Sequence, residues 1–320
     1  MRIITAAEIA EVADLREIVE TLRFTFRTPP ITPVRHHHSM ERPGEAPDST
    51  LLLMPAWTDF RGKGSSARGY TGVKIVTVVP DNHTRNLPSV VGAYLLMSGE
   101  SGVPLALLDG QALTLWRTAA ASALASLYLS RSDSTKLLMV GAGALAPYLI
   151  RAHAAVRPLN HVLIWNRSPQ RAEKLASKLG DLRVTLNVTD DLEGAARGAD
   201  IISCATLADE PIIKGAWLSE GQHVDLVGAF KPTMREVDSA AVSKARVFCD
   251  TRDGALKEAG DLVIPIGEGA FSMEDVAGDL FDLCQGRRGG RRYYDQITLF
   301  KSVGTAAEDL AVAAHVFARA

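Results

Sequence analysis

A glycine-containing turn at residues 141–146 carries the clearest chemical signal in the sequence. It follows the pattern G-x-G-x-x-A, directly after an apolar segment and directly before a predicted helix. In such a unit the first glycine permits a tight turn, the second lets a pyrophosphate approach the backbone, and a small third residue allows close packing. The helix N-terminus adds free N–H groups and a positive dipole end. The turn predicts a dinucleotide site, although an ordinary tight turn can show the same letters. The expected contacts are Gly141, Gly143, Ala144 and Leu145.

The end of the next predicted strand selects between nicotinamide cofactors. An Asp or Glu there would hydrogen-bond the ribose 2′-OH of NAD. The chain has Asn166-Arg167-Ser168 instead, so no carboxylate repels a 2′-phosphate. Arg167 can pair with that phosphate in bidentate fashion, and Ser168 can donate a hydrogen bond. The pattern favours NADPH, with NADH possible, unless Arg167 is only a solvated loop residue.

Three cations are considered as partners of an anionic substrate. Lys74 lies inside the apolar segment 73–76, so it is either a lysine whose ammonium reaches water or a buried charge with a function. Arg117 lies in an Ala-rich helix that joins two halves of the chain, where it either reaches a ligand or lies on the helix surface. Arg35 precedes a polar segment and by itself indicates nothing.

Two further clusters are interpreted as structural. His36-His37-His38 has no convergent geometry and no accompanying carboxylate or cysteine cluster, so we predict loop residues and no metal site. The run Arg287–Arg292 predicts a solvated turn rather than a nucleic-acid site, because 35 basic and 37 acidic residues give a net charge of −2.

The composition is that of a globular protein. Its 320 residues allow two domains, and 47% of them are hydrophobic. No run approaches the roughly 18 apolar residues of a membrane span, and residues 1–5 lack the apolar region of a signal peptide. Cys204, Cys249 and Cys284 are odd in number and far apart, so we expect free thiols and a cytoplasmic location.

The elements that must position these residues change character near residue 111. Before it, the patterns predict one helix at 5–23, a loop at 36–50, strands at 51–54, 73–79, 90–97 and 104–109, and a turn at 61–66. This order is typical of an α+β domain with an antiparallel or mixed sheet.

After residue 111, strands and helices alternate. Strands are predicted at 136–140, 162–165, 183–186, 201–204, 223–227 and 247–249, with helices at 113–129, 146–156 and 168–179. A capping-box pattern, Thr305-Ala306-Ala307-Glu308, begins a last helix, as Thr5 to Glu8 begins the first. The alternation predicts an α/β fold with a doubly wound parallel sheet.

Several segments in this order match a known family over nearly the whole chain. They are Pro33-Val34-Arg35, Met54-Pro55-Ala56, Gly72–Val76, Pro80-Asp81-Asn82, Leu113–Ala120, the 141–146 turn, Gly221-Gln222-His223, Val227–Phe230 and Phe300–Gly304. On them the chain resembles the ornithine cyclodeaminase/mu-crystallin family of NAD(P)-dependent proteins. The resemblance implies a discontinuous substrate-binding and dimerisation domain at 1–115 plus 305–320, a dinucleotide-binding Rossmann domain at 116–304, and a homodimer built through the first domain's sheet.

The resemblance also assigns roles to residues. It puts the cations that bind a substrate carboxylate at Arg35 and Lys74, and an arginine between substrate and cofactor phosphates at Arg117. Glu258 falls in a segment that faces the pocket in mu-crystallin-like members. These four are the expected catalytic residues. The further cofactor contacts that it implies are Thr118, Thr206, Val227, Gly228, Phe230 and Ser302.

One departure from the family pattern bears on the reaction. Ornithine cyclodeaminases have an aspartate where this chain has Phe230, and a phenylalanine accepts no proton. The segment Val227–Glu236 resembles the reductase branch, which reduces cyclic ketimine acids such as Δ1-pyrroline-2-carboxylate and Δ1-piperideine-2-carboxylate. The prediction is an NAD(P)H-dependent cyclic-imine reductase with an apolar wall at Phe230, its proton donor being water, the iminium itself or Glu258. The alternatives are a cyclodeaminase, an amino-acid dehydrogenase acting on pyruvate, and a crystallin-like protein that binds NADPH without turnover.

Overall fold

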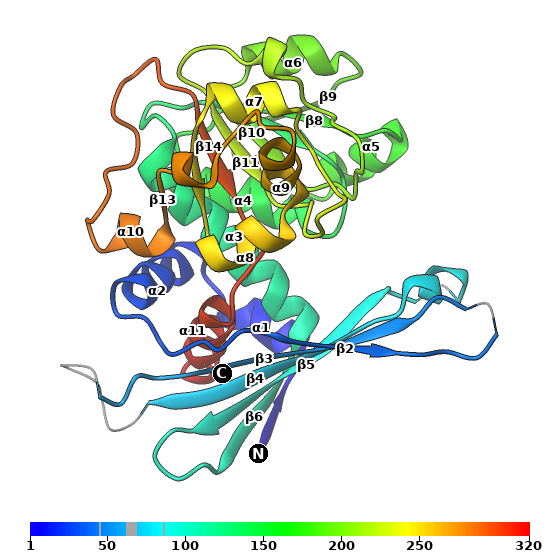
Figure 1. Cartoon of the computed structure of the whole chain (residues 1–320), viewed down its shortest axis with the longest axis vertical. Coiled ribbons are helices and arrows are strands. Elements are labelled where there is room, and N and C mark those ends of the chain that lie inside the picture. The colour runs from blue at the N-terminus through cyan, green and yellow to red at the C-terminus, as the bar shows by residue number, and fades with distance from the viewer. Residues whose placement is uncertain (45, 62–68, 86) are drawn as a thin grey trace. The chain divides into compact units, whose positions relative to one another are not determined.

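The computed structural model describes residues 1–44, 46–61, 69–85 and 87–320. Its chain divides into two compact units, Met1–Arg117 with Thr305–Ala320 (unit 1) and Thr118–Gly304 (unit 2), coloured along the sequence in Figure 1. Unit 1 is discontinuous because the last helix returns to it from the far end of the chain. In the described ranges, no helix combines the length and the apolar character that crossing a membrane requires.

Unit 1 is built on a six-stranded mixed sheet in the order β1-β6-β5-β4-β3-β2. Its strands are β1 (Arg2–Ile4), β2 (His36–Met40), β3 (Ser49–Trp57), β4 (Tyr70–Val78), β5 (Val90–Ser98) and β6 (Pro104–Asp109). Its other elements are α1 (Ala6–Val12), α2 (Leu15–Arg27), the 3-10 helix η1 (Pro80–Arg85), the first part of α3 (Gly110–Leu129) and α11 (Ala306–Phe317). β1 runs parallel to β6, and the other neighbouring strands are antiparallel. The predicted α+β domain with a mixed sheet is confirmed.

The helices of unit 1 lie on one face of this sheet (Figure 1). Burial alternates along the strands, so that Lys74 on β4 and its cross-strand neighbour Tyr94 on β5 point to the covered face. α11 packs against β3, β4 and β5 on that face. Because successive side chains of a strand point to opposite faces of the sheet, this alternation decides which side chains meet α11 and which lie on the opposite face.

Two predictions for the N-terminal part are wrong. The predicted helix at 5–23 is two helices, because Asp14 caps α2 by accepting a hydrogen bond from the Glu17 N–H at 3.0 Å. Asp is among the strongest N-cap residues, and it breaks the helix in spite of the continuing apolar pattern. The predicted loop at 36–50 contains β2, which pairs with β3 at the edge of the sheet. Its side chains are all exposed, so backbone pairing forms the strand without an apolar period. Most of the predicted turn at 61–66 lies outside the described residues.

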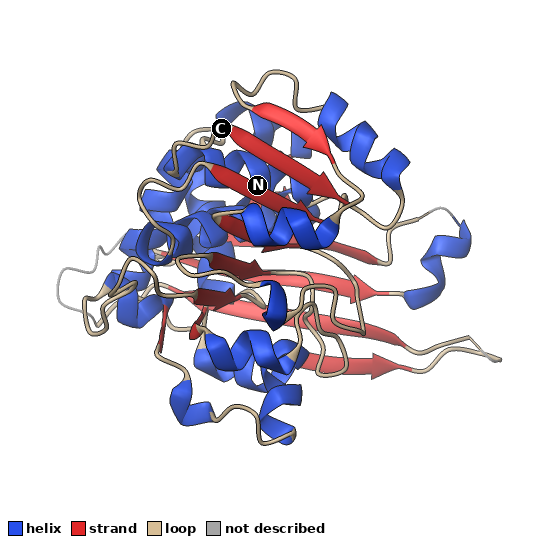
Figure 2. Ribbon diagram, turned by 90° about the horizontal axis from the view of Figure 1, so that it is seen from above, coloured by secondary structure: helices blue, strands red, loops and turns tan. Residues whose placement is uncertain are grey.

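Unit 2 has an eight-stranded, all-parallel sheet in the order β13-β12-β14-β11-β10-β7-β8-β9, and Figure 2 shows helices flanking its strands. Its strands are β7 (Lys136–Val140), β8 (His161–Trp165), β9 (Thr185–Val188), β10 (Ile201–Cys204), β11 (His223–Leu226), β12 (Arg246–Cys249), β13 (Gly278–Asp279) and β14 (Thr298–Lys301). Its helices after α3 are α4 (Ala146–Val156), α5 (Pro169–Ser177), α6 (Leu192–Gly198), η2 (Gly215–Trp217), α7 (Ser239–Lys244), α8 (Arg252–Glu258), α9 (Gly260–Gly267), η3 (Met273–Asp275) and α10 (Leu280–Cys284). The predicted doubly wound parallel sheet is confirmed.

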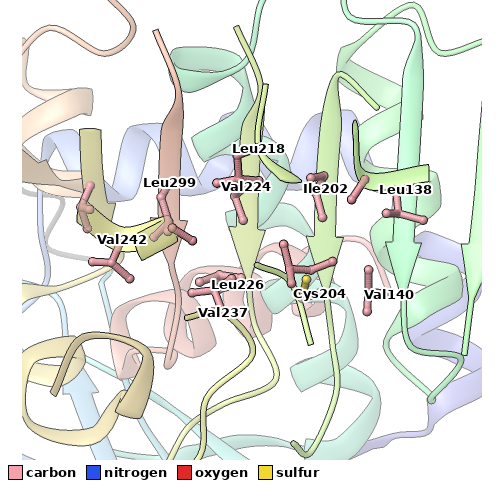
Figure 3. Close-up of a cluster of buried hydrophobic side chains, with 14 of the residues drawn as sticks. Leu138, Val140, Ile202, Cys204, Leu218, Val224, Leu226, Val237, Val242 and Leu299 are labelled. Atoms are coloured by element: carbon pink, nitrogen blue, oxygen red, sulfur yellow. The ribbon is translucent and has the colours of Figure 1, made fainter. Parts of the chain in front are cut away.

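A large apolar core of unit 2 lies against the central strands. Residues of β7, β10, β11 and β14 point to one layer, as Figure 3 shows for Leu138, Ile202, Val224 and Leu299. All four are fully buried. Strands covered on both faces show continuous apolar runs rather than alternation, which explains why the sequence predicts β7 and β10 at their observed bounds. The three cysteines are free and buried, as expected.

The strand order of unit 2 reverses between β7 and β10. From β7 the chain proceeds outward through β8 to β9, then returns to the other side of β7 at β10 and continues to β11. In open parallel sheets, ligands bind beyond the carboxyl ends of the strands at such a reversal. The loops after β7, β8, β10 and β11 therefore define where a ligand of this unit binds.

Candidate functional site

The turn after β7 has the backbone that a dinucleotide site needs. Gly141 has φ +107°, and a Cβ there would lie 2.7 Å from the Ala205 carbonyl oxygen, so only glycine fits. A Cβ at Gly143 would meet no atom of the described residues within 4 Å. Gly143 and Ala144 are exposed, and among the described residues no side chain caps the N-terminus of α4. The turn can therefore receive a phosphate on exposed backbone at a helix N-terminus.

The loop after β8 braces this turn. Asn166 accepts a hydrogen bond from the Ala142 N–H at 3.1 Å and donates one to the Ser168 carbonyl at 2.9 Å. The Asn166 side chain thus holds the turn by binding a backbone N–H of the turn. Arg167 is exposed, and the Ser168 hydroxyl donates to Gln170 at 3.0 Å. Arg167 is the side chain of this loop that can reach a ligand from solvent.

One buried carboxylate joins the loops after β10 and β11. Glu236 Oε1 accepts from the Thr206 N–H at 2.7 Å and from the Thr206 hydroxyl at 2.9 Å. Its Oε2 accepts from the Gly228 N–H at 2.8 Å. A Cβ at Gly228 would lie 1.9 Å from the Thr206 carbonyl oxygen, so the loops touch through their backbones. Sequence reasoning singled out Thr206, Val227 and Gly228 but missed Glu236, which holds them.

Glu236 belongs to a buried charge cluster. Asp261 on α9 accepts a hydrogen bond from the Glu236 N–H at 2.6 Å, and its other oxygen lies 3.0 Å from Lys301 Nζ. All three side chains are fully buried. Burial raises the pKa of Glu236 from 4.5 to about 7, with Lys301 opposing the rise and Asp261 adding to it. The cluster therefore contains an acid that titrates near neutral pH.

The remaining residues expected in unit 2 are dispersed. Ser302 is buried and donates to Asp250 at 3.2 Å, and Thr118 is buried within α3. Phe230 is 39% exposed in the loop after β11. Glu258 is the last, half-buried residue of α8. Of these four, Phe230 has the most surface to offer a ligand.

Two of the expected cations of unit 1 meet two carboxylates of α11. Lys74 Nζ lies 2.9 Å from Asp309 Oδ1 and 2.8 Å from Oδ2. Arg117 donates to the same Asp309 Oδ1 at 3.2 Å and to Glu308 Oε2 at 2.9 Å. Lys74 and Arg117 are 3% and 6% exposed, so both are buried charges rather than surface residues. Thr305 accepts from the Ala307 N–H as a simple cap, while Glu308 turns to Arg117, so the predicted capping box does not form.

The electrostatics of this cluster centre on Lys74. Burial lowers the pKa of Lys74 from 10.5 to about 8, with Asp309 opposing the decrease, while Arg117 and then Arg35 add to it. Arg35 is half-buried and near enough to act on Lys74 electrostatically. Tyr94 is fully buried, and within the described part of the chain its hydroxyl has no hydrogen-bond partner. Burial raises the pKa of Tyr94, so the phenol stays neutral.

Sequence reasoning missed Asp309, Glu308 and Tyr94. The available signal was two adjacent acids in the otherwise apolar segment Ala306–Phe317, where charged residues are rarely buried unless paired. In the ranges that the structure describes, no three His, Cys, Asp or Glu side chains gather as a metal ion would require.

A discontinuous α+β unit and a doubly wound parallel unit with a glycine turn at its reversal define the class of a two-unit dinucleotide-binding protein. The profile of the ornithine cyclodeaminase/mu-crystallin family matches residues 2–320, and the chain belongs to that family. The family assignment made from the sequence motifs is confirmed.

Three named relatives are similar to this chain over nearly its whole length. It is 38% identical to the Delta(1)-pyrroline-2-carboxylate reductase of Colwellia psychrerythraea, over 98% of each chain. The structure of the Thermococcus litoralis Delta(1)-pyrroline-2-carboxylate reductase in complex with NADH and L-proline matches with a TM-score of 0.91 and 31% identity, covering 100% of this chain and 97% of that one. An archaeal alanine dehydrogenase dimer with bound NAD matches with a TM-score of 0.88 and 28% identity, covering 100% of this chain.

Proposed function

We propose that the protein is an NAD(P)H-dependent reductase of cyclic ketimine carboxylates. It converts Δ1-pyrroline-2-carboxylate to L-proline and Δ1-piperideine-2-carboxylate to L-pipecolate. The observation that carries this proposal is the full-length similarity to a reductase whose structure holds both NADH and L-proline. The Colwellia relative, with its reductase name, supports the same chemistry.

Reduction of the imine needs a hydride at carbon and a proton at nitrogen, and it leaves an oxidised nicotinamide and an amino acid. A reduced dinucleotide bound to unit 2 would supply the hydride. Arg35 and Lys74 would bind the substrate carboxylate, and Arg117 would lie between the substrate and the cofactor phosphates. Asp309 pairs with Lys74 and Glu308 pairs with Arg117, so α11 holds both of these cations in place. The proton at nitrogen would come from water, from the iminium itself or from the half-buried Glu258.

The cofactor half of the proposal rests on unit 2. The exposed backbone of Gly143 and Ala144 would bind the pyrophosphate at the N-terminus of α4. Thr206, Val227 and Gly228 would border the nicotinamide. Arg167, with no carboxylate after β8, supports a preference for NADPH over NADH. Ser302 and Thr118, whose side chains are buried, would add further contacts to the cofactor.

Phe230 separates this proposal from a lyase. Family members that release ammonia from ornithine carry an aspartate there, and Phe230 offers an apolar wall instead. Similarity to an alanine dehydrogenase keeps a second candidate, reductive amination of a keto acid, on the same two units.

We also propose a homodimer formed through the open face of the unit 1 sheet. In register across β3, β4, β5 and β6, that face shows Pro55, Val73, Leu95 and Leu107, all half-buried. Ile75, one row away, is 38% exposed. A contiguous apolar face of this kind is typical of an interface. A cytoplasmic location, in keeping with three free thiols, is part of the proposal.

The test measures the loss of reduced nicotinamide with each cyclic imine, and with pyruvate plus ammonia. A parallel reaction with ornithine and NAD is assayed for ammonia. Rapid oxidation with either imine is the expected result. Ammonia from ornithine without imine reduction would refute the proposal, and turnover of pyruvate alone would favour the dehydrogenase.

A further inference from the structure

The carboxylate of Glu236 has the form of a clamp between two loops. One oxygen takes both donors of Thr206, and the other takes the Gly228 N–H. The side chain is fully buried, so water does not compete for these donors. A carboxylate accepts at both oxygens, whereas an amide of the same size accepts at one end and donates at the other. The three donors therefore favour the ionised form of Glu236.

The two loops lie on a definite side of the strand reversal. In doubly wound sheets the residue after the second strand contacts the adenosine ribose, and here that position is the loop after β8. β10 and β11 lie on the other side of β7. Their loops consequently border the end of the crevice that remains for the nicotinamide. The contact of Gly141 with Ala205 shows that the turn after β7 and the loop after β10 are direct neighbours.

We propose that Glu236 is a positioning residue for the nicotinamide end of the dinucleotide, and that it acts in its ionised form by holding the Thr206 and Gly228 loops in one arrangement. This inference rests on the proposed function, because it assumes that unit 2 binds a nicotinamide dinucleotide. Glu236 would touch neither the substrate nor the cofactor. It would fix the loop backbone that contacts the cofactor.

The groups around Glu236 decide when it is ionised. Lys301, on β14, favours the carboxylate, and Asp261, on α9, opposes it. Cys204, at the end of β10, stays a neutral thiol, because burial raises its pKa and Glu236 adds to the rise. Burial raises the pKa of Glu236 itself to about 7. Protonation would place a hydrogen on one oxygen and remove one acceptor, so the clamp should loosen below neutral pH.

The test compares binding of NADH with binding of ADP-ribose, which lacks the nicotinamide, by calorimetric titration of the full chain. Glu236→Gln should weaken NADH binding by about tenfold, the effect of losing a hydrogen bond to a charged group, and leave ADP-ribose binding unchanged. The matched control is Asp238→Asn, two residues away. Asp238 accepts from the Gly215 and Ala241 N–H groups at 2.8 and 2.9 Å, away from both loops, so this variant should bind both ligands normally.

The pH dependence provides a second readout. In the wild type, NADH affinity relative to ADP-ribose affinity should fall as pH drops through about 7, and Glu236→Gln should abolish this dependence. Thr206→Val, which removes only the hydroxyl donor, should weaken NADH binding less and serves if Glu236→Gln does not fold.

Three outcomes would overturn the inference. If Glu236→Gln and Thr206→Val both bind NADH as tightly as the wild type, Glu236 does not position the loops for the nicotinamide. Equal losses for NADH and ADP-ribose would assign Glu236 a purely structural role. A wild-type chain that binds neither ligand refutes the proposed function itself, and the inference with it.

Discussion

Replacing Asp309 tests the charge cluster of unit 1 most directly. Asp309→Asn keeps the size of the side chain but removes the charge that faces Lys74 at 2.8 Å and Arg117 at 3.2 Å. Glu308 would then be the remaining carboxylate of the cluster for two buried cations. Removing one partner of a buried ion pair costs about 3–5 kcal/mol. Because asparagine still offers one acceptor oxygen, we expect the free energy of unfolding to fall by about 3 kcal/mol, the lower end of that range.

The same change should alter how the protein responds to pH. Asp309 is the main group that opposes the lowering of the Lys74 pKa, which lies at about 8. Without it the pKa falls further, so Lys74 is neutral over more of the working pH range. The substrate carboxylate needs the ammonium form. In the wild type the KM for the imine acid should therefore rise above about pH 8, and in Asp309→Asn the rise should begin at lower pH.

The assay combines urea unfolding with steady-state kinetics over a pH series, and it measures the KM of the imine and of the reduced dinucleotide separately. Glu17→Gln is the control, since Glu17 belongs to an exposed ion pair with Arg319 in the same unit. Such surface pairs contribute about 0–1 kcal/mol. The reasoning is refuted if Asp309→Asn unfolds at the same urea concentration as the control and keeps the wild-type pH profile.

Three other substitutions follow from the structure. Gly141→Ala should lower the thermal unfolding temperature because of its positive φ and the close Ala205 oxygen, whereas Gly143→Val should fold normally and lose dinucleotide affinity in a binding titration. Equal stability of the two variants would contradict this assignment. Arg167→Glu should raise the KM for NADPH about tenfold or more, the effect of losing a charged phosphate contact, with little change for NADH; an unaltered ratio of the two KM values removes Arg167 from cofactor selection. Ile75→Asp should give monomers in sedimentation analysis if the open sheet face forms the dimer, while a dimer that persists would place the interface elsewhere.

The fold could be predicted where local sequence determines the structure. The parallel strands β7 and β10 carry unbroken apolar runs because both faces of their sheet are covered. β2 could not be predicted, since an exposed edge strand of histidines has no apolar period and exists through its pairing with β3. β14 was missed for a related reason. It is short, it ends in Lys301, and the sequence shows neither its insertion between β11 and β12 nor the Asp261 that pairs with Lys301.

The same distinction between local and distant residues explains which parts of the candidate site could be predicted. The glycine turn is visible in the sequence because its requirements, a positive φ and open space, belong to consecutive residues. Asp309 is 235 residues from Lys74, and Glu236 is 30 residues from Thr206, so no spacing rule connects them. Glu308 shows how a local rule misleads. Its position three residues after Thr305 fits a capping box, yet the buried Arg117 competes for the same carboxylate and binds it.

The two buried clusters are better explained by ligand binding than by stability. Burying charges costs several kcal/mol per ion, and well-packed apolar residues of similar volume often stabilise a protein at least as well as a buried ion pair. Unit 1 nevertheless buries Lys74, Arg117, Asp309 and Glu308, and unit 2 buries Glu236, Asp261 and Lys301. In each cluster one group titrates near neutral pH, Lys74 at about 8 and Glu236 at about 7. Such groups respond most strongly to a charge arriving beside them, because a small electrostatic change alters their protonation. An anionic substrate would raise the pKa of Lys74 and stabilise its ammonium form, and an ionised Glu236 would hold the Thr206 and Gly228 loops for the cofactor, as proposed above.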